Sequence, residues 1–146
     1  MKPEPGTYAL VLRGRASTEV TVGRWGILRV KPEYYVYVGS AFGPGGVQAR
    51  VRRHFRKSKR QRWHIDYLRA AAEPICAWCN YASRHLEHEW ARAFSQQEGV
   101  SCIRGFGSSD CNCDGHLFTM STEPNGAEVL REFGGILGLC EYRTVA

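Results

Sequence analysis

Residues 34–55 of the chain, YYVYVGSAFGPGGVQARVRRHF, decide its fold. The stretch Tyr34–Val38 is dense in aromatic and β-branched residues, which is typical of a central strand. Gly43–Gly46 combines one proline with three glycines and predicts a loop. Apolar residues then recur at every fourth position from Val47 to Phe55, which predicts a helix with one buried stripe.

Similar patterns extend this strand, loop and helix into one mixed domain. Apolar residues alternate with a period of two from Tyr8 to Leu12, so Tyr8, Leu10 and Leu12 should share one face of a strand. We expect an α/β fold of the α+β type in a single domain over residues 1–146, with a core at about 6–97 and a C-terminal extension at about 98–146. The remaining expected elements are strands at Glu19–Val22 and Pro74–Ala82, a helix beginning at Trp63, a helix over Ser83–Gln97 with Ser83 as N-cap and Leu86, Trp90 and Phe94 as its buried stripe, and a helix at Pro124–Ile136 interrupted by Gly134 and Gly135.

Length and hydropathy narrow the class of protein. The 146 residues suffice for one ordinary core, and no apolar run reaches the roughly 18 residues that a membrane span needs. The first residues lack the long apolar stretch and cleavage site of a signal peptide. We therefore expect a soluble cytoplasmic or nucleoid-associated protein that does not bind membranes, and the sequence leaves its oligomeric state open.

The net charge of +6 is concentrated in one run. Between residues 50 and 62 no acidic residue interrupts eight basic ones: Arg50, Arg52, Arg53, Arg56, Lys57, Lys59, Arg60 and Arg62. Such a run favours a polyanionic partner, of which nucleic acid is the commonest inside a cell. On the expected helix Arg52, Arg53 and Arg56 point outward, where they can meet phosphates, with a merely solvated surface as the alternative.

Two tyrosines and an arginine lie beside this basic run. Tyr8 follows Gly6-Thr7 in the first strand, and Tyr37 precedes Val38-Gly39-Ser40 in the central strand. Tyrosine hydroxyls can orient or deprotonate water, and the Arg50 guanidinium can hold charge on a phosphorus centre. This set is typical of a site that attacks a phosphodiester.

Further candidates lie on the two later helices and near Arg50. Glu87 is adjacent to its helix's buried stripe, and a lone carboxylate at a cleft rim suits Mg²⁺ or Mn²⁺, which keep several waters. His54 is four residues after Arg50 and should reach the same cleft. His64 can line that cleft, although we favour a capping or core-edge role for it.

Six cysteines raise the question of zinc. Cys76 and Cys79 form one close pair, and Cys111, Cys113 and His116 form a second group near Asp110. A zinc site built from these residues is chemically possible. We favour a structural interpretation without zinc, in which the thiols are reduced and Asp110 accepts hydrogen bonds from backbone amides.

Taken together, the motifs resemble the GIY-YIG nuclease superfamily, and more narrowly its small stand-alone branch of Uri-type endonucleases, formerly a domain of unknown function. The resemblance covers most of residues 6–118, and the order and spacing of the motifs make it specific. Those motifs are Gly6–Leu10, Tyr35–Ala41, Arg50–His54, Trp63–Leu68 and Gly105–Cys113.

The resemblance implies a small, mostly antiparallel three-stranded central sheet flanked by helices. It also implies roles: Tyr8 and Tyr37 as the tyrosines of the two motifs, Arg50 and His54 as the helix pair, and Glu87 as the metal ligand. Gly39 and Ser40 belong to the second motif.

The expected activity is metal-dependent endonucleolytic hydrolysis by in-line attack of water, with DNA preferred over RNA. Tyr8 would take a proton from the water, helped by Tyr37, and cations nearby would have to lower its pKa from about 10. His54 would support the phosphate or the leaving group. A basic surface formed by Arg52, Arg53, Arg56, Lys57, Lys59 and Arg60 would hold the nucleic-acid backbone. A catalytically inactive binding module and a zinc-containing adaptor are the alternatives.

Overall fold

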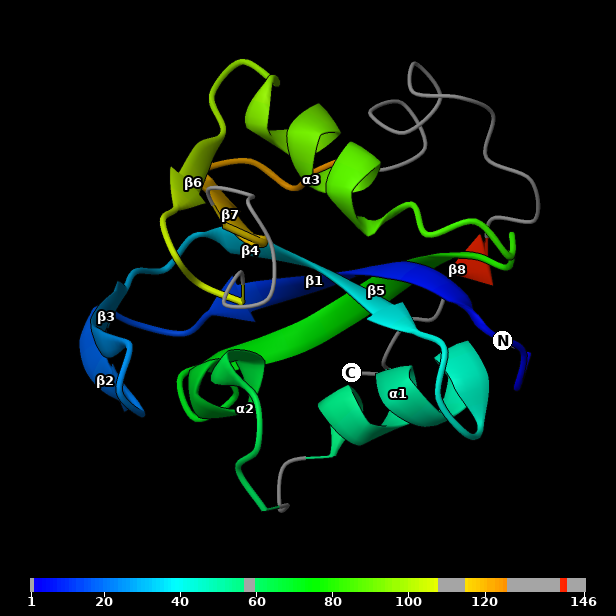
Figure 1. Cartoon of the computed structure of the whole chain (residues 1–146). Coiled ribbons are helices and arrows are strands. Elements are labelled where there is room, and N and C mark those ends of the chain that lie inside the picture. The colour runs from blue at the N-terminus through cyan, green and yellow to red at the C-terminus, as the bar shows by residue number, and fades with distance from the viewer. Residues whose placement is uncertain (1, 57–59, 108–114, 126–139, 142–146) are drawn as a thin grey trace.

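The chain folds into a six-stranded antiparallel sheet with helices on both faces and a separate two-stranded ribbon, as seen in a computed structural model that describes residues 2–56, 60–107, 115–125 and 140–141 (Figure 1). No helix among these residues is long and apolar enough to cross a membrane. The elements are β1 (Gly6–Gly14), β2 (Thr18–Val22), β3 (Gly26–Val30), β4 (Tyr34–Ala41), α1 (Gly46–Phe55), α2 (His64–Leu68), β5 (Ala72–Asn80), α3 (Glu87–Ser95), β6 (Ser101–Ile103), β7 (Leu117–Met120) and β8 (Cys140–Glu141).

The main sheet has the order β6-β7-β4-β1-β5-β8, and every neighbouring pair is antiparallel. The expected α+β class with a mostly antiparallel sheet is confirmed, and β4-β1-β5 forms its centre. The expected number of three strands is too small, because β7 and β6 continue the sheet beyond β4 and β8 adds two residues beside β5. The strand expected at residues 19–22 is β2, which pairs with β3 in a separate two-stranded ribbon.

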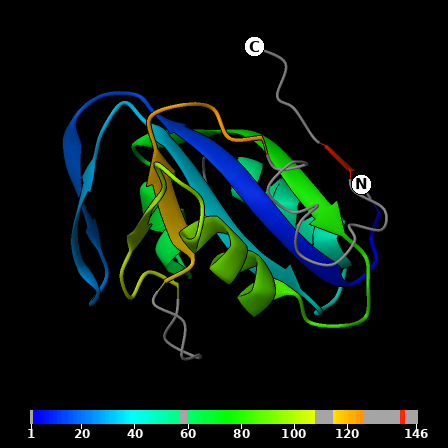
Figure 2. The same cartoon turned by 90° about the horizontal axis from the view of Figure 1, so that it is seen from above.

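Two layers of core lie on the two faces of the sheet. Tyr8, Leu10 and Leu12 pack on the face covered by α1 and α2, whereas Ala9 and Val11 pack on the face covered by α3. Figure 1 shows α3 on one side of the sheet and α1 and α2 on the other, and Figure 2 shows α3 in front of the strands. Strand β1 is therefore buried on both faces, and the hydroxyl-bearing side chains of its threonine and tyrosine are buried with it.

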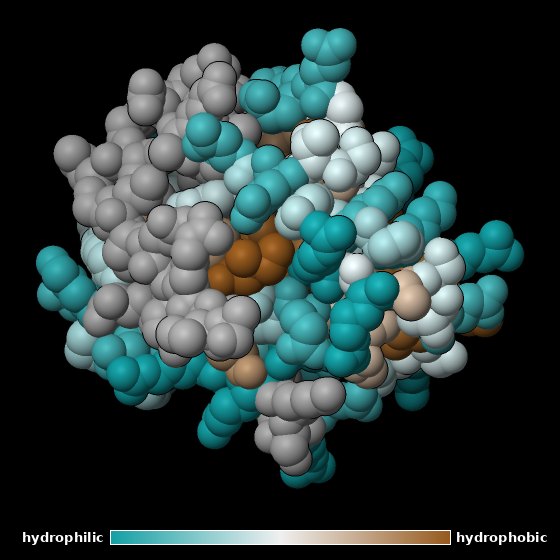
Figure 3. Space-filling model, turned by 180° about the vertical axis from the view of Figure 1, so that it is seen from behind, coloured by the Kyte–Doolittle hydropathy of each residue, from teal (hydrophilic) through white to brown (hydrophobic). Residues whose placement is uncertain are grey.

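The coloured part of the surface seen from behind, which belongs to the described residues, is mostly hydrophilic, with a brown apolar area near its middle (Figure 3). Among the described residues, Ile27 on β3 is the exposed large hydrophobic side chain, at 60% exposure. A single apolar residue at the surface is ordinary in a folded domain and does not by itself mark an interface.

The helices follow their sequence patterns with one correction. Helix α1 begins at Gly46 and buries Val47 and Val51, as predicted. Helix α3 buries Trp90 and Phe94, but it begins at Glu87, so the prediction of Ser83 as its N-cap is wrong. Ser83 is exposed, while the Leu86 amide donates a hydrogen bond to the buried Thr7 hydroxyl on β1. The chain before α3 is thus held by the sheet rather than by a local cap. The helix expected at Pro124–Ile136 lies almost entirely outside the described residues.

A buried ion pair fixes α2 against α1. The Arg53 guanidinium donates to both Asp66 oxygens, at 2.7 and 2.8 Å, and the amides of Arg62 and Trp63 donate to Oδ2 at 2.8 and 2.9 Å. The Asp66 side chain is fully buried and that of Arg53 is 17% exposed. The prediction that Arg53 points outward is therefore wrong, because α2 supplies it with a carboxylate.

Replacing Asp66 with asparagine should lower the free energy of unfolding by about 3–5 kcal/mol, because it leaves the largely buried Arg53 without its counter-charge. Urea denaturation measures this change. Glu19→Gln is the matched control: the Glu19 and Arg29 side chains are 60% and 82% exposed, and their loss should cost less than about 1 kcal/mol. Equal effects of the two substitutions would contradict the structural role of the Arg53–Asp66 pair.

The same pair should make stability fall at acidic pH. Burial opposes ionisation of Asp66, but the hydrogen bonds from Arg53 and the two amides outweigh it and hold its pKa below the ordinary value of 3.8. The stabilisation is complete well above pH 3.8 and is lost as the pH falls through the lower pKa of the folded state. In Asp66→Asn, this part of the acid dependence should be absent.

Candidate active site

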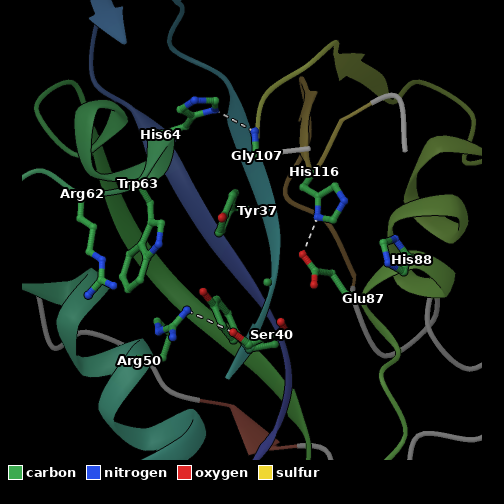
Figure 4. Close-up of a pocket in the computed structure, with 12 residues that line it drawn as sticks. Tyr37, Ser40, Arg50, Arg62, Trp63, His64, Glu87, His88, Gly107 and His116 are labelled. Carbon is green, nitrogen blue, oxygen red and sulfur yellow. Dashed lines mark hydrogen bonds and ion pairs between the residues drawn. The ribbon is translucent and has the colours of Figure 1, made fainter. Parts of the chain in front are cut away.

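A polar cavity of about 410 Å³ lies beside the half of β4 that does not pair with β7 (Figure 4). Strand β1 pairs with β4 along its whole length, whereas β7 pairs only with Tyr34–Tyr37. Side chains from both faces of the sheet meet beside the second half of β4. The strands and α1 contribute Tyr8, Tyr37, Gly39, Ser40 and Arg50 to the lining. The remaining lining residues are Arg62, Trp63, His64, Glu87, His88, Gly107 and His116.

The structure brings together four residues expected to act as one set: Tyr8, Tyr37, Arg50 and Glu87. The further candidates Gly39, Ser40, His64 and His116 also line the cavity. The basic residues Arg52, Arg56 and Arg60 are exposed and do not line it, and Lys57 and Lys59 lie outside the described residues. The candidates Asp110, Cys111 and Cys113 lie outside the described residues as well.

A glycine opposite Tyr8 makes room for its ring. In the β1–β4 register Tyr8 faces Gly39, and a Cβ at position 39 would lie 2.5 Å from the Tyr8 hydroxyl oxygen and 2.6 Å from Cζ. Both distances are shorter than non-bonded atoms allow, so only glycine permits this arrangement. The ring of Tyr37 lies on the same side of the sheet, with its centroid 6.5 Å from that of Tyr8.

The hydroxyl of Tyr8 contacts a buried histidine. It is 2.6 Å from His54 Nε2, and His54 is fully buried. The expectation that His54 supports the phosphate or the leaving group is therefore wrong, because His54 does not line the cavity. One helical turn beyond Arg50, α1 faces the core, and His54 lies behind Tyr8 as the partner of its hydroxyl.

Both tyrosines are neutral phenols in the free protein. Burial raises the pKa of Tyr8 well above 10, the Tyr37 hydroxyl adds to this, and the nearby Arg50 only partly opposes it. The pKa of Tyr37 is also raised, first by burial and then by the charge of Glu87. The expectation that neighbouring cations lower the pKa of Tyr8 is wrong for this state, since burial dominates.

Arg50 is held in place by an aromatic ring and a backbone carbonyl. Its guanidinium lies 4.3 Å from the centre of the Trp63 ring and donates to the Ser40 carbonyl at 3.2 Å. Arg53 and Arg62 also contact the Trp63 ring, at 4.2 and 5.1 Å. Trp63 therefore joins the arginines of α1 to the start of α2 and orients Arg50 toward the cavity.

The carboxylate of Glu87 faces Arg50 across the cavity from the start of α3. His116 Nδ1 donates to Glu87 Oε1 at 2.8 Å, and the Glu87 side chain is 24% exposed. Burial opposes its ionisation, but the hydrogen bond and charge of His116, a hydrogen bond from Ser40 and the charge of His88 outweigh this. The pKa of Glu87 therefore lies below its ordinary value, and the group is an anion at neutral pH.

Glu87 is the one carboxylate among the described residues that line the cavity, and a carboxylate of this kind can hold a hard cation. An ionised, partly exposed carboxylate in a polar cavity can hold a Mg²⁺ ion that keeps most of its waters. No cluster of three or more His, Cys, Asp or Glu side chains able to hold a metal occurs within the residues described. Cys76 and Cys79 pack in the core clusters on opposite faces of the sheet, so they cannot share one zinc ion.

Several lining residues carry roles that the sequence did not indicate. The sequence suggests His116 only as a zinc ligand, yet in the structure it is 1% exposed and forms a hydrogen-bonded pair with Glu87. Its main chain is fixed by hydrogen bonds to β4 and to Phe106. No local sequence pattern predicts the contact between His116 and Glu87, and none predicts the contact between Trp63 and Arg50.

A family model described as "Domain of unknown function DUF123" matches residues 7–138. The chain belongs to the DUF123 family. The matched range includes every residue that lines the cavity, from Tyr8 to His116. No curated protein and no solved structure matches this DUF123 chain.

Gly39→Ala should displace the Tyr8 ring, because the added Cβ would overlap the Tyr8 hydroxyl. Any activity that requires the Tyr8 hydroxyl should therefore be lost. We expect a changed Tyr8 signal in NMR spectra and a lower melting temperature. Gly43→Ala is the matched control, because a Cβ there meets no atom within 4 Å and the backbone needs no left-handed conformation. Unchanged Tyr8 signals in Gly39→Ala would contradict the close packing.

Proposed function

We propose that this DUF123 protein is a metal-dependent endonuclease that hydrolyses phosphodiester bonds in nucleic acid, with DNA preferred over RNA. The observation that carries the proposal is the convergence of Tyr8, Tyr37, Arg50 and Glu87 on one polar cavity. The resemblance of the sequence motifs to GIY-YIG nucleases, and to their Uri-type branch, also supports it. Arg52, Arg56 and Arg60 are exposed and would supply a surface for a polyanion.

Glu87 is the residue that would hold the cation. When bound, Mg²⁺ or Mn²⁺ supplies Lewis-acid stabilisation of the phosphate and of the leaving oxygen. His116 fixes one oxygen of the carboxylate and thereby its orientation. The low pKa keeps Glu87 ionised in the absence of substrate.

The Tyr8–His54 contact offers a way to activate water without forming a phenolate. Tyr8 would accept the proton of the attacking water while its own hydroxyl proton passes to His54 Nε2, 2.6 Å away. The raised pKa of Tyr8 is then no obstacle, because the phenol stays neutral throughout. Tyr37, also a neutral phenol, would orient the water or the phosphate by donating a hydrogen bond.

Arg50 would stabilise the negative charge that develops on phosphorus. Its guanidinium is pre-positioned by Trp63 and the Ser40 carbonyl, so little reorganisation is needed when the charge appears. Arg50 would thus contact the scissile phosphate from one side of the cavity, and Glu87, on the other side, is the residue that would hold the cation.

Glu87→Gln should abolish nicking of plasmid DNA in Mg²⁺ and leave the affinity for DNA within about twofold, because the amide keeps the shape but cannot replace the anionic ligand. Nicking is followed on agarose gels and binding by fluorescence anisotropy. Glu89→Gln is the control: Glu89 is exposed and pairs with Arg84 at the surface. Full activity of Glu87→Gln would refute the assignment, and binding without cleavage by the wild type would indicate an inactive binding module.

Arg50→Ala should lower the single-turnover cleavage rate by about 10²- to 10³-fold, the usual cost of losing one donor to a developing charge. The double variant Arg52→Ala and Arg56→Ala should instead weaken binding and reduce the slope of log K against log salt by about two. If Arg50→Ala changes only the affinity, Arg50 anchors a phosphate and does not act in the reaction.

A further inference from the structure

One wall of the cavity presents hydrogen-bond donors. It is formed by Arg50 from α1 and by Arg62, Trp63 and His64 around the start of α2 (Figure 4). The opposite wall carries Glu87 with His88 and His116. In this view Arg50 and His64 lie at opposite ends of the donor wall, with Tyr37 between them. A phosphate bound between Arg50 and Glu87 leaves His64 to contact another part of the substrate.

The proton of His64 is fixed on one ring nitrogen by the backbone. The Gly107 amide donates a hydrogen bond to His64 Nδ1 at 2.9 Å. An amide can donate only to a nitrogen that carries a lone pair, so Nδ1 is unprotonated and the proton of the neutral ring is on Nε2. Protonation of Nδ1 would set two N–H groups against each other.

The surroundings of the ring keep it in this state. The Phe106 ring packs edge-on against His64 at 5.4 Å, and burial of the half-buried imidazole lowers its pKa. Within the described part of the chain, Nε2 has no hydrogen-bond partner, although the ring lines the cavity. His64 is therefore a neutral donor with one N–H group left for a ligand.

We propose that His64 Nε2–H binds an oxygen of a phosphate that neighbours the scissile one in a polynucleotide. The inference rests on the proposed function, because the scissile phosphate is assigned to Arg50 and Glu87. A phosphate oxygen matches a lone N–H donor on a wall that also carries two guanidinium groups. Because of this subsite, the protein should bind a polynucleotide more tightly than a substrate that contains a single phosphodiester.

Three forms of the protein test the subsite: the wild type, His64→Phe, which keeps an aromatic ring against Phe106 but has no donor, and His64→Gln, whose side-chain amide restores a donor. Each is first compared by melting temperature. The ¹⁵N chemical shifts of the wild-type imidazole report its tautomer and should show a proton on Nε2 and none on Nδ1. A ring protonated on Nδ1 would overturn the proposal.

Binding of a fluorescein-labelled oligodeoxynucleotide is then measured in the Glu87→Gln background, where no turnover is expected. His64→Phe should weaken binding by about tenfold to 100-fold, the cost of one hydrogen bond to a charged group, and His64→Gln should recover most of it. Equal binding by all three forms, or failure of glutamine to restore it in a folded protein, would overturn the proposal.

Hydrolysis of bis(p-nitrophenyl) phosphate, which has no neighbouring phosphate, shows whether His64 binds the substrate or only supports the structure of the site. With Glu87 intact, the loss of kcat/KM in His64→Phe should be about tenfold larger on the oligonucleotide than on this diester, and the difference should lie in KM. Equal losses on both substrates would contradict the subsite. If the wild type hydrolyses neither substrate, the proposed nuclease function fails, and the binding comparison still decides the role of His64.

Discussion

The site depends on one pairing in the sheet, in which Tyr8 of β1 lies opposite Gly39 of β4. Because successive side chains of a strand point to opposite faces, a shift of one residue would turn Tyr8 away from α1. The missing Cβ at Gly39 lets the Tyr8 ring cross the neighbouring strand and reach the cavity. Arg50 and His54 then come to Tyr8 from one helix, α1, which packs on the same face.

The cavity combines neutral, negative and positive side chains in a way that would suit the proposed hydrolysis of a phosphodiester. Burial keeps the tyrosines neutral, whereas hydrogen bonds keep Glu87 ionised and Trp63 holds Arg50 in place. Neutral donors, one anion and fixed cations can bind a phosphate and a metal ion together without large rearrangement. The buried Arg53–Asp66 pair contributes to this arrangement although it lies outside the cavity. It fixes α2, and therefore Trp63, relative to α1.

Local sequence patterns were sufficient for the central elements, and four of the residues that the sequence singled out, Tyr8, Tyr37, Arg50 and Glu87, line one cavity in the structure. Strand β1 and helix α1 follow clear apolar periodicities, β4 is dense in aromatic and β-branched residues, and the motifs around Tyr8, Tyr37 and Arg50 are short and well spaced. Strands β6 and β7 were missed because three or four residues are too few to show a period. The partners of Glu87 and Arg53 were missed because His116 and Asp66 come from other elements, and periodicity carries no information about such contacts.

The most direct test of a metal-dependent nuclease is to incubate the wild-type protein with labelled DNA and RNA substrates in Mg²⁺, in Mn²⁺ or in EDTA. Single strands, duplexes, flaps and junctions should all be included, because the cavity alone does not select among them. Metal-dependent hydrolysis predicts discrete products from at least one DNA substrate in Mg²⁺ or Mn²⁺ and none in EDTA. Cleavage that persists in EDTA, or binding of DNA with no cleavage under any condition, would contradict it.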